Sequence, residues 1–500
     1  MDDYFLSFLV LLSLTLLTFF ILKVGKSFKS IGTTSNLPPG PWKLPIFGSI
    51  HHLIGHLPHH RMRELSQKYG PLMHLQLGET SAIVVSSPEI AKEVLKTHEV
   101  TFAHRPRFVA AEIVTYGFTN ITFSPYGDYW KQLRKICTME VLSAKRVRSF
   151  QSIREEEVSN LVRYISMNTG STINLTDKVL SMTYSIVARA AFGDIGEEQE
   201  AFILFMRRIM RMSEAFGVTN LFPSQNWLHV VTGMMHKLKE IHRTGDMLLE
   251  NIINAATAKN GGVGSLMSVL SDLKDRGAPE CHLTINNIKA VIQDIFIAGS
   301  ETSSVTVDWA FSEMLKNPIV LKRAQAEVRQ VFGSKGCVDE VALHELKYLK
   351  VVIKETLRLH PPAPLLLPRE CGETCEINGY TIPAGTQVYV NAWAIGRDPK
   401  YWIEGDKFYP ERFLDCQVDY KGSDFEYIPF GAGKRICPGI FFATTNMEIL
   451  LAQLLYYFDW ELPFGASGES LDMSEIFGTT VRRKIDLFVI PISYNHVHVA

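Results

Sequence analysis

One uninterrupted apolar stretch opens the chain. Residues 4–22 carry no charged side chain, and 19 helical residues at about 1.5 Å each would span roughly 28 Å, which is close to the thickness of a bilayer core. Acidic residues precede the stretch and basic residues follow it: Asp2, Asp3, Lys23, Lys26 and Lys29. By the positive-inside rule, this pattern predicts a single membrane-spanning helix with the rest of the chain in the cytosol.

A cleaved signal peptide is the alternative for this segment. It would need a basic start, a shorter apolar run and a small-residue cleavage site, and the sequence has none of these. We therefore expect residues 1–30 to be an amino-terminal membrane anchor with its basic flank. Residues 31–48 contain Pro38, Pro39, Pro41 and Pro45 and are expected to form a proline-rich hinge; an ordinary linker remains the alternative.

Beyond the hinge, the pattern is mainly helical with short strands. Residues 73–77 and 82–85 alternate around Gly78 and predict a strand pair, and residues 286–316 form the longest candidate helix, which Asn317-Pro318 ends. After Pro361, short strands such as residues 387–390 precede a final helix over about 441–458. The order is not a repeated βαβ unit. We expect one α+β catalytic domain over residues 49–500, mainly α with small β-sheets.

Composition narrows the function classes. The 500 residues are 46% hydrophobic and 21% charged, which excludes a disordered chain. Lys and Arg number 51 against 52 Asp and Glu, so the net charge of −1 argues against general nucleic-acid binding. Seven cysteines in 500 residues exclude a disulfide-rich secreted scaffold.

The strongest chemical signal is one cysteine in a glycine-rich loop. Residues 430–439 read Phe-Gly-Ala-Gly-Lys-Arg-Ile-Cys-Pro-Gly and open into the final helix, whose dipole would favour a thiolate at Cys437. A redox nucleophile would need a nearby histidine base, and a zinc site would need a second Cys or His at short spacing. The loop offers neither. One thiolate beside Arg435 fits an axial bond to haem iron, with the arginine meeting a propionate.

The loop resembles the F-x-x-G-x-R-x-C-x-G pattern of the cytochrome P-450 family at every fixed position, and further motifs follow in family order along the chain. The resemblance implies a haem-thiolate monooxygenase with haem b (iron protoporphyrin IX), and Cys437 as the only protein ligand to iron. The Pro-Pro-Gly-Pro hinge and the segments 354–358 and 425–430 look like the plant microsomal group that oxidises terpenoids and alkaloids.

The resemblance also assigns the other site residues. Glu355 and Arg358 form an E-x-x-R pair on one helix face, with Arg412 as a third member that fixes the region behind the loop. The side chains expected to bind haem propionates are Trp130, Arg134, Arg369 and Arg435, with Arg105 as a further contact. Ala298 is expected to contact the haem.

The polar interruption at residues 298–303 of the longest helix has two interpretations. Glycine and hydroxyl residues at that point are typical of Ser/Thr side chains bonding back to the preceding turn. The family resemblance instead implies an oxygen-binding groove in which Glu301 and Thr302 manage protons. An intact Glu301-Thr302 pair also argues against a haem-thiolate isomerase or dehydratase.

The resemblance implies partners and a location. Because no Rossmann or flavin motif is present, electrons would come from NADPH through a separate NADPH-cytochrome reductase, with cytochrome b5 as an optional second donor. Lys131, Lys135 and Lys434 could form a basic patch for the donor. The other partners would be O2, an apolar small-molecule substrate and the endoplasmic reticulum membrane. A membrane-anchored haem carrier or sensor is the alternative outside enzymes.

The substrate class is only partly constrained. Family alignment places substrate contacts mostly at apolar positions, which favours a terpenoid; a monoterpenoid indole alkaloid fits the same chemistry. The ranges are 102–121, 202–212, Ile292, Ile295, Phe296, 363–367 and 477–480. The histidines at 51, 52, 56, 59 and 60 lack regular ligand spacing, so we expect no metal site there. Cys371 and Cys375 are expected to be free thiols.

Overall fold

The computed structural model describes residues 14, 15, 18, 36–194, 196–212, 221–225, 233–258, 264–276 and 283–494. The predicted membrane helix at 4–22 lies outside these residues apart from three positions. Among the described residues, no helix combines the length and apolarity needed to cross a bilayer. The predicted hinge is described from residue 36 onward.

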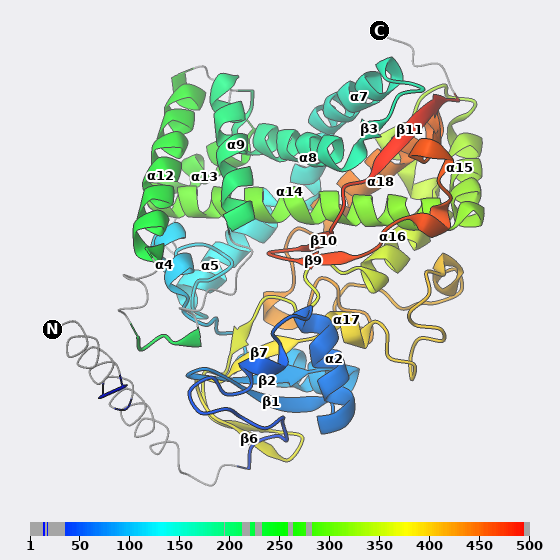
Figure 1. The fold of residues 1–500 in the computed structure, drawn as a ribbon. Helices are drawn as coiled ribbons and strands as arrows, with labels where there is room; N and C mark the ends of the chain where they lie inside the picture. The colour runs from blue at the N-terminus through cyan, green and yellow to red at the C-terminus, as the bar shows by residue number, and fades with distance from the viewer. Residues whose placement is uncertain are drawn as a thin grey trace, which may run out of the picture.

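Helices dominate the described chain (Figure 1). The α-helices are α2 (Pro58–Tyr69), α3 (Pro88–Lys92), α4 (Val109–Val114), α5 (Asp128–Ile136), α6 (Ala144–Ser149), α7 (Gln151–Met167), α8 (Leu175–Phe192), α9 (Glu197–Met212), α12 (Met234–Ala258), α13 (Leu266–Asp275), α14 (Ile285–Lys316), α15 (Pro318–Phe332), α16 (Lys347–Leu359), α17 (Ala392–Ile395) and α18 (Ile440–Tyr457). Short 3-10 turns include η4 (Glu340–Glu345), η5 (Pro410–Phe413) and η6 (Gly433–Arg435).

The strands form small sheets. They are β1 (Leu72–Leu77), β2 (Thr80–Val85), β3 (Ile173–Asn174), β4 (Arg369–Glu370), β5 (Cys375–Ile377), β6 (Tyr380–Ile382), β7 (Gln387–Val390), β8 (Phe458–Glu461), β9 (Glu475–Phe477), β10 (Val481–Arg483) and β11 (Phe488–Ser493). The largest sheet has the order β1-β2-β7-β4, in which only β2 and β7 are parallel. A three-stranded sheet has the order β3-β11-β8, and β9–β10 and β5–β6 are hairpins. The expected α+β class is therefore confirmed.

Helix α14 is the central element of the core. A capping box closes its first turn. The backbone N–H of Asn287 donates to Thr284 Oγ1 at 3.3 Å, and the backbone N–H of Thr284 donates to Asn287 Oδ1 at 2.8 Å. Asn317-Pro318 ends the helix, as the sequence predicts. α14 packs most extensively against α8 on one side and α18 on another, and residues from both halves of the helix belong to the largest apolar cluster.

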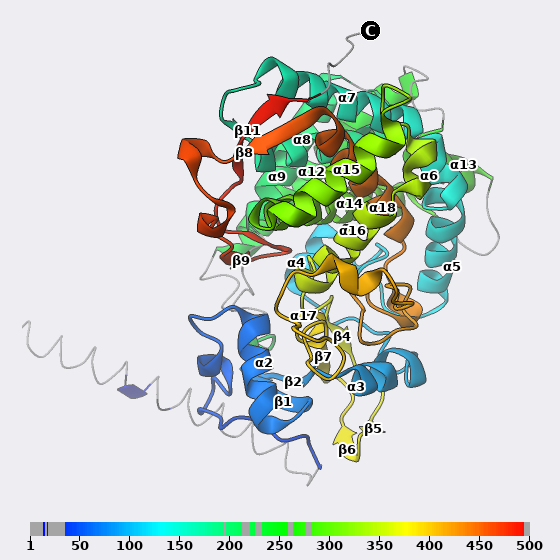
Figure 2. The same ribbon diagram turned by 90° about the vertical axis from the view of Figure 1, so that its right-hand side faces the viewer.

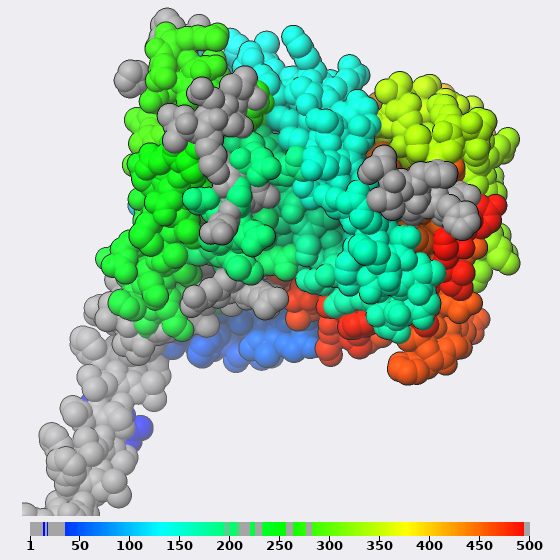
Figure 3. Space-filling view, turned by 90° about the horizontal axis from the view of Figure 1, so that it is seen from above, coloured from blue at the N-terminus to red at the C-terminus, as the bar shows by residue number. Residues whose placement is uncertain are grey.

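The remaining helices cover this core and leave the main sheet at the opposite end. Figure 2 shows α15, α16 and α18 stacked beside α14, while β1, β2 and α2 lie below them. In the space-filling view of Figure 3, the cyan and green helices cover the upper face, with the lime α15 and the red carboxyl-terminal strands at one edge. The cysteine loop lies between these two parts of the molecule.

The described half of the predicted hinge is bound to the sheets. His74 N donates to Pro39 O at 2.9 Å, and Thr381 N donates to Asn36 O at 2.8 Å. A Cβ at Gly40 would lie 2.0 Å from His74 O, so the segment and β1 approach as closely as a glycine permits. Residues 36–48 are thus packed on the body of the protein through backbone hydrogen bonds and close contacts.

Candidate functional site

The Cys437 loop is shaped by backbone hydrogen bonds and glycines. Cys437 N donates to Phe430 O and Ile436 N donates to Gly433 O, each at 3.0 Å, so the chain folds back on itself before α18 begins. Gly433 has a φ of +66°, and a Cβ there would lie 1.9 Å from Leu95 O. Only glycine combines that conformation with so close an approach. The loop is therefore pressed against the segment that follows α3.

The electrostatics of Cys437 differ from the simple helix-dipole expectation. Burial raises the pKa of the thiol, while the Gly439 N–H and the Arg134 guanidinium act in the opposite direction and do not overcome it. The dipole is weak here because α18 starts at Ile440, three residues after the cysteine. A metal ion bonded to the sulfur would supply the missing positive charge and deprotonate it outright.

Four arginines converge beside this loop, and they come from four separate segments. Arg435 Nε donates to Ala103 O at 2.8 Å, and Arg369 Nη2 donates to Ala432 O at 2.8 Å. Arg105 Nη1 donates to Leu367 O at 2.7 Å, while Arg134 Nη2 donates to Ile436 O. These donors all contact backbone carbonyls. Among the described residues, none of the four arginines forms an ion pair with a carboxylate.

Such a cluster needs an anionic partner. Burial, and then repulsion from Arg105, Arg369 and Arg134, lowers the pKa of Arg435 to about 8. Burial and Arg105 likewise lower the pKa of Arg369 to about 9, and Arg369 Nη1 is buried without a hydrogen-bond partner in the described structure. Buried cations are costly unless paired. The residues therefore fit a ligand that brings carboxylates, such as the propionates of haem.

The Trp130 ring packs against the guanidinium of Arg435. The Arg435 guanidinium carbon lies 4.1 Å from the Trp130 ring centroid, and Trp130 Nε1 donates to Ile121 O at 2.9 Å. Arg435 Nη1 donates to the same carbonyl at 3.1 Å. The indole N–H, which the sequence assigns to a propionate, is thus directed to the backbone. The ring holds Arg435 by a cation–π contact.

The polar segment of α14 lies close to the start of α18. A Cβ at Gly299 would lie 3.6 Å from Phe442 Cε1 and 3.4 Å from Val187 Cγ2. Phe442 is in the first turn of α18, five residues after Cys437, so Gly299 packs near the start of the helix that follows the cysteine loop. Ala298 is exposed in the middle of this otherwise mostly buried helix, while Ser300 and Ser303 are buried on its other side.

The hydroxyl of Thr302 donates to Ala298 O at 2.5 Å, which is the back-bond to the preceding turn that one interpretation of this segment predicts. Thr306 makes the same bond to Thr302 O at 2.9 Å. Glu301 is partly buried beside it. Ala298, Glu301 and Thr302 lie in the middle of α14, with the threonine proton directed along the helix.

The predicted ion triad behind the loop is confirmed. Glu355 accepts from Arg358 at 2.7 and 2.8 Å and from Arg412 Nε at 3.0 Å. Glu355 and Arg358 are completely buried, and Arg358 also donates to Gly405 O at 2.6 Å. The triad joins α16 to η5 and to the segment before it. It therefore fixes the backbone of the segment that precedes η5.

The proposed basic patch is partly neutralised. Lys131 lies 3.0 Å from Asp128, and Lys434 lies 3.2 Å from Glu99. Surface ion pairs of this kind leave part of the positive field in place but reduce it.

Among the predicted substrate contacts, Phe296 packs in the core. Its ring centroid lies 4.8 Å from that of Phe202 and 5.3 Å from that of Tyr184.

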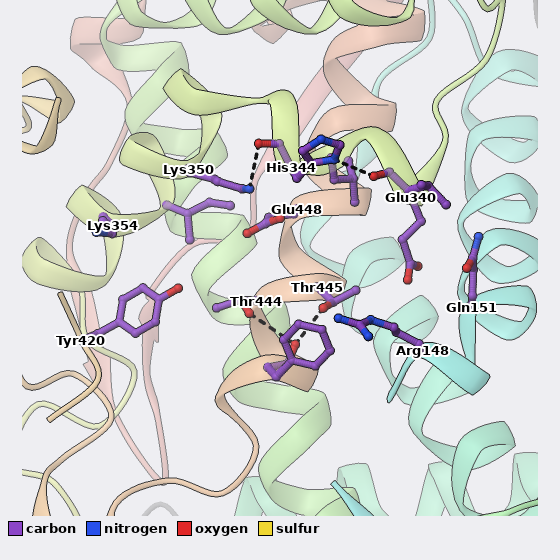
Figure 4. Close-up of a pocket in the computed structure, with 14 residues that line it drawn as sticks. Arg148, Gln151, Glu340, His344, Lys350, Lys354, Tyr420, Thr444, Thr445 and Glu448 are labelled. Atoms are coloured by element: carbon purple, nitrogen blue, oxygen red, sulfur yellow. Dashed lines mark hydrogen bonds between the residues drawn. The ribbon is translucent and has the colours of Figure 1, made fainter. Parts of the chain in front are cut away.

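A cavity of about 560 Å³ lies on another part of the surface, between η4, α16 and α18 (Figure 4). Glu448, Thr444 and Thr445 line it from α18, while Lys350 and His344 line it from the neighbouring segments. Burial raises the pKa of Glu448 to about 7. None of the site residues predicted from the sequence lines this cavity.

The sequence analysis did not identify one cluster of titratable side chains. His59 and His60, for which no metal site is expected, meet Glu475, a residue more than 400 positions away. Since nothing near Glu475 in the sequence marks it as a ligand, histidine spacing alone could not identify the group.

Comparisons with known proteins agree with this geometry. A family model described as Cytochrome P450 matches residues 38–485. The premnaspirodiene oxygenase of Hyoscyamus muticus is 51% identical, with 98% of this chain and 99% of that protein covered. The 5-epiaristolochene 1,3-dihydroxylase of Nicotiana tabacum is 50% identical, over 97% and 98%.

A further relative and a solved structure widen the comparison. The desmethyl-deoxy-podophyllotoxin synthase of Sinopodophyllum hexandrum is 52% identical, over 97% of both chains. A zebra fish cytochrome P450 solved with progesterone superposes with a TM-score of 0.76 at 26% identity and covers 87% of this chain and 99% of its own.

Proposed function

Because this chain belongs to the cytochrome P450 family and is a haem-containing monooxygenase, we propose that it oxidises an apolar plant small molecule by hydroxylation or epoxidation. The observation that carries the site assignment is a group of four arginines around Cys437, none of which forms an ion pair with a carboxylate in the described part of the chain. Family membership as a monooxygenase replaces the alternative of a haem carrier or sensor.

Cys437 is the proposed iron ligand, and the arginines are the proposed partners of the haem propionates. When bound, the haem supplies the reductive activation of dioxygen and the transfer of one oxygen atom. Arg134, Arg369 and Arg435 would neutralise its carboxylates, with Trp130 keeping Arg435 in place. Ala298, as a small residue on the open side of α14, would let the planar ligand approach the helix.

Glu301 and Thr302 are proposed to control protons during turnover. Thr302 would turn its hydroxyl away from Ala298 O, or use its lone pairs, to position a water beside the haem. Glu301, one residue before it and partly buried, would connect that water to solvent. Neither role requires Thr302 to ionise.

A terpenoid is the favoured substrate class. Two relatives are named for premnaspirodiene and for 5-epiaristolochene, whose names denote unsaturated hydrocarbons, and the predicted substrate segments are mostly apolar. A relative of equal similarity is named for podophyllotoxin chemistry, so identity near 50% does not fix the substrate. A monoterpenoid indole alkaloid remains the second candidate class.

The remaining proposals concern partners and location. Electrons would come from an NADPH-cytochrome reductase, with cytochrome b5 as an optional donor, because the chain has no dinucleotide-binding motif of its own. Residues 1–30 would anchor the protein in the endoplasmic reticulum membrane by one span, with residues 49–500 in the cytosol. The uncharged stretch at 4–22 and its basic carboxyl flank support this orientation.

The decisive experiment for the haem site is Cys437→Ser. The carbon monoxide complex of the reduced wild-type protein should show the red-shifted Soret band of thiolate ligation, and the variant should lack it. Cys337→Ser, at an exposed cysteine, is the matched control and should keep the band. A thiolate band that survives in Cys437→Ser would overturn the assignment. Wild-type protein with reductase and NADPH, screened against terpenoids and alkaloids, then tests the substrate class.

A further inference from the structure

Two consecutive histidines of α2 contact a carboxylate of the β9–β10 hairpin. His59 Nε2 lies 2.9 Å and His60 Nε2 lies 3.0 Å from the same oxygen, Oε2 of Glu475. The three ligand atoms lie within 4.8 Å of one another. Figures 1 and 2 both show β9 above the upper end of α2, where the helical part of the molecule meets the main sheet.

A third imidazole points into the same group. His360 Nε2 lies 2.8 Å from Glu313 Oε1, and its Nδ1 lies 3.9 Å from Glu475 Oε1. The buried Nδ1 of His360 has no hydrogen-bond partner in the described structure, and the same holds for the buried Nδ1 of His59. Two of the three rings therefore each leave one buried nitrogen without a protein partner.

Glu475 is nearly buried, and among the described residues its ion-pair partners are histidines only. Arg397 also acts on Glu475 electrostatically, but its guanidinium lies 3.2 Å from Asp406. The nitrogen atoms in contact with the carboxylate therefore come from imidazole rings.

The ligand set is that of a transition-metal site. Ligands about 2.1 Å from a tetrahedral ion lie about 3.4 Å from one another, and the two histidine-to-carboxylate distances are within 0.5 Å of that spacing. Nitrogen ligands with one carboxylate suit zinc, whereas magnesium and calcium take oxygen ligands.

We propose that His59, His60 and Glu475 bind one zinc ion that fastens α2 to the β9–β10 hairpin. A water would complete the four positions around the ion. His60 is 40% exposed and gives the ion a route from solvent, while His59 is completely buried. Ring contacts hold both histidines, because His60 stacks on Trp393 with centroids 4.2 Å apart and His59 meets the same ring edge-on at 5.1 Å. This site is separate from the Cys437 loop and does not rest on the proposed function.

The test uses the full-length, tag-free holoenzyme. After treatment with a chelator, it is titrated with Zn²⁺ in competition with a zinc indicator, and bound zinc is counted by elemental analysis. We expect one zinc per chain in the wild type. Glu475→Gln should weaken binding by at least about a hundredfold, because it removes the one charged ligand. His56→Ala, at an exposed histidine two residues before α2, is the control and should bind like the wild type.

Wild-type protein alone gives a second test, in case a variant fails to fold. Carbethoxylation of histidines, mapped by mass spectrometry with and without Zn²⁺, should show that zinc protects His60 and leaves His56 reactive. A wild type that takes up no zinc, a Glu475→Gln protein with unchanged affinity, or equal modification of His60 in both conditions would each overturn the site.

Discussion

At the scale of single residues, one hydroxyl side chain can either stabilise its helix or take part in the reaction. Thr302 illustrates this, because its hydroxyl bonds back to Ala298 O and yet lies one residue from Glu301 and near the start of α18. Thr306 makes the same back-bond one turn later. Comparing variants at the two positions therefore distinguishes a structural role of the hydroxyl from a catalytic one.

Thr302→Ala is expected to lower coupled turnover by about a hundredfold, which is the lower end of the range for one positioned proton-transfer group. Haem content should not change. NADPH consumption, product and hydrogen peroxide are measured together, and peroxide should rise as product falls, because the reduced oxygen receives its protons in the wrong place.

Two matched variants make this prediction specific. Thr306→Ala loses an equivalent back-bond and should keep its coupling, whereas Thr302→Ser retains a hydroxyl and should recover most of the activity. Full coupling in Thr302→Ala, or an equal loss in Thr306→Ala, would show that the hydroxyl serves only the helix.

At the scale of elements, the buried triad decides how firmly α16 and η5 are joined. Removing one partner of a buried ion pair leaves the others uncompensated and costs about 3–5 kcal/mol. Glu355→Gln should therefore lower the stability of the holoenzyme by about that amount, measured by denaturant unfolding with haem release as the signal.

Glu64→Gln is the matched control for the triad. Glu64 pairs with Arg61 at the same i,i+3 spacing, but the pair is exposed, and such pairs contribute about 0–1 kcal/mol. Equal losses in the two variants would mean that burial does not determine the strength of the triad.

Elements with a local signal were predicted well from the sequence. The β1–β2 pair around Gly78 and the full length of α14 follow from periodicity, glycine and an Asn-Pro stop, all of which lie within the element itself. The last helix was placed one residue too late at both ends, because Phe458 continues the apolar pattern while its backbone opens β8.

Long-range pairings were accessible only where a family resemblance supplied them. The contact of Arg412 with Glu355 was expected on that basis and is confirmed. The pairing of Glu475 with His59 has no signal in either sequence neighbourhood, so it was missed. The hydrogen bond from Trp130 Nε1 to Ile121 O could not be predicted either, because periodicity places an indole on a helix face but does not orient its N–H.

At the scale of the whole molecule, the predicted anchor and the catalytic body should be separable. Deleting residues 1–30 removes the uncharged stretch and keeps the segment from Asn36 onward, whose hydrogen bonds tie it to the sheets. The shortened protein should retain its haem and be released from membranes by alkaline extraction, although peripheral attachment is compatible with this prediction. A shortened protein that stays integral to the membrane would refute a single anchor.

The parallel pairing of β2 with β7 determines when the main sheet can form during synthesis of the chain. Val85 pairs with Val390, so roughly 300 residues must leave the ribosome after β2 before its partner exists. At about 5–20 residues per second, that wait is about 15–60 s. Throughout it, an apolar strand edge is open to other chains. The four arginines also come from both ends of the sequence, so the prosthetic group can be enclosed only after synthesis is nearly finished.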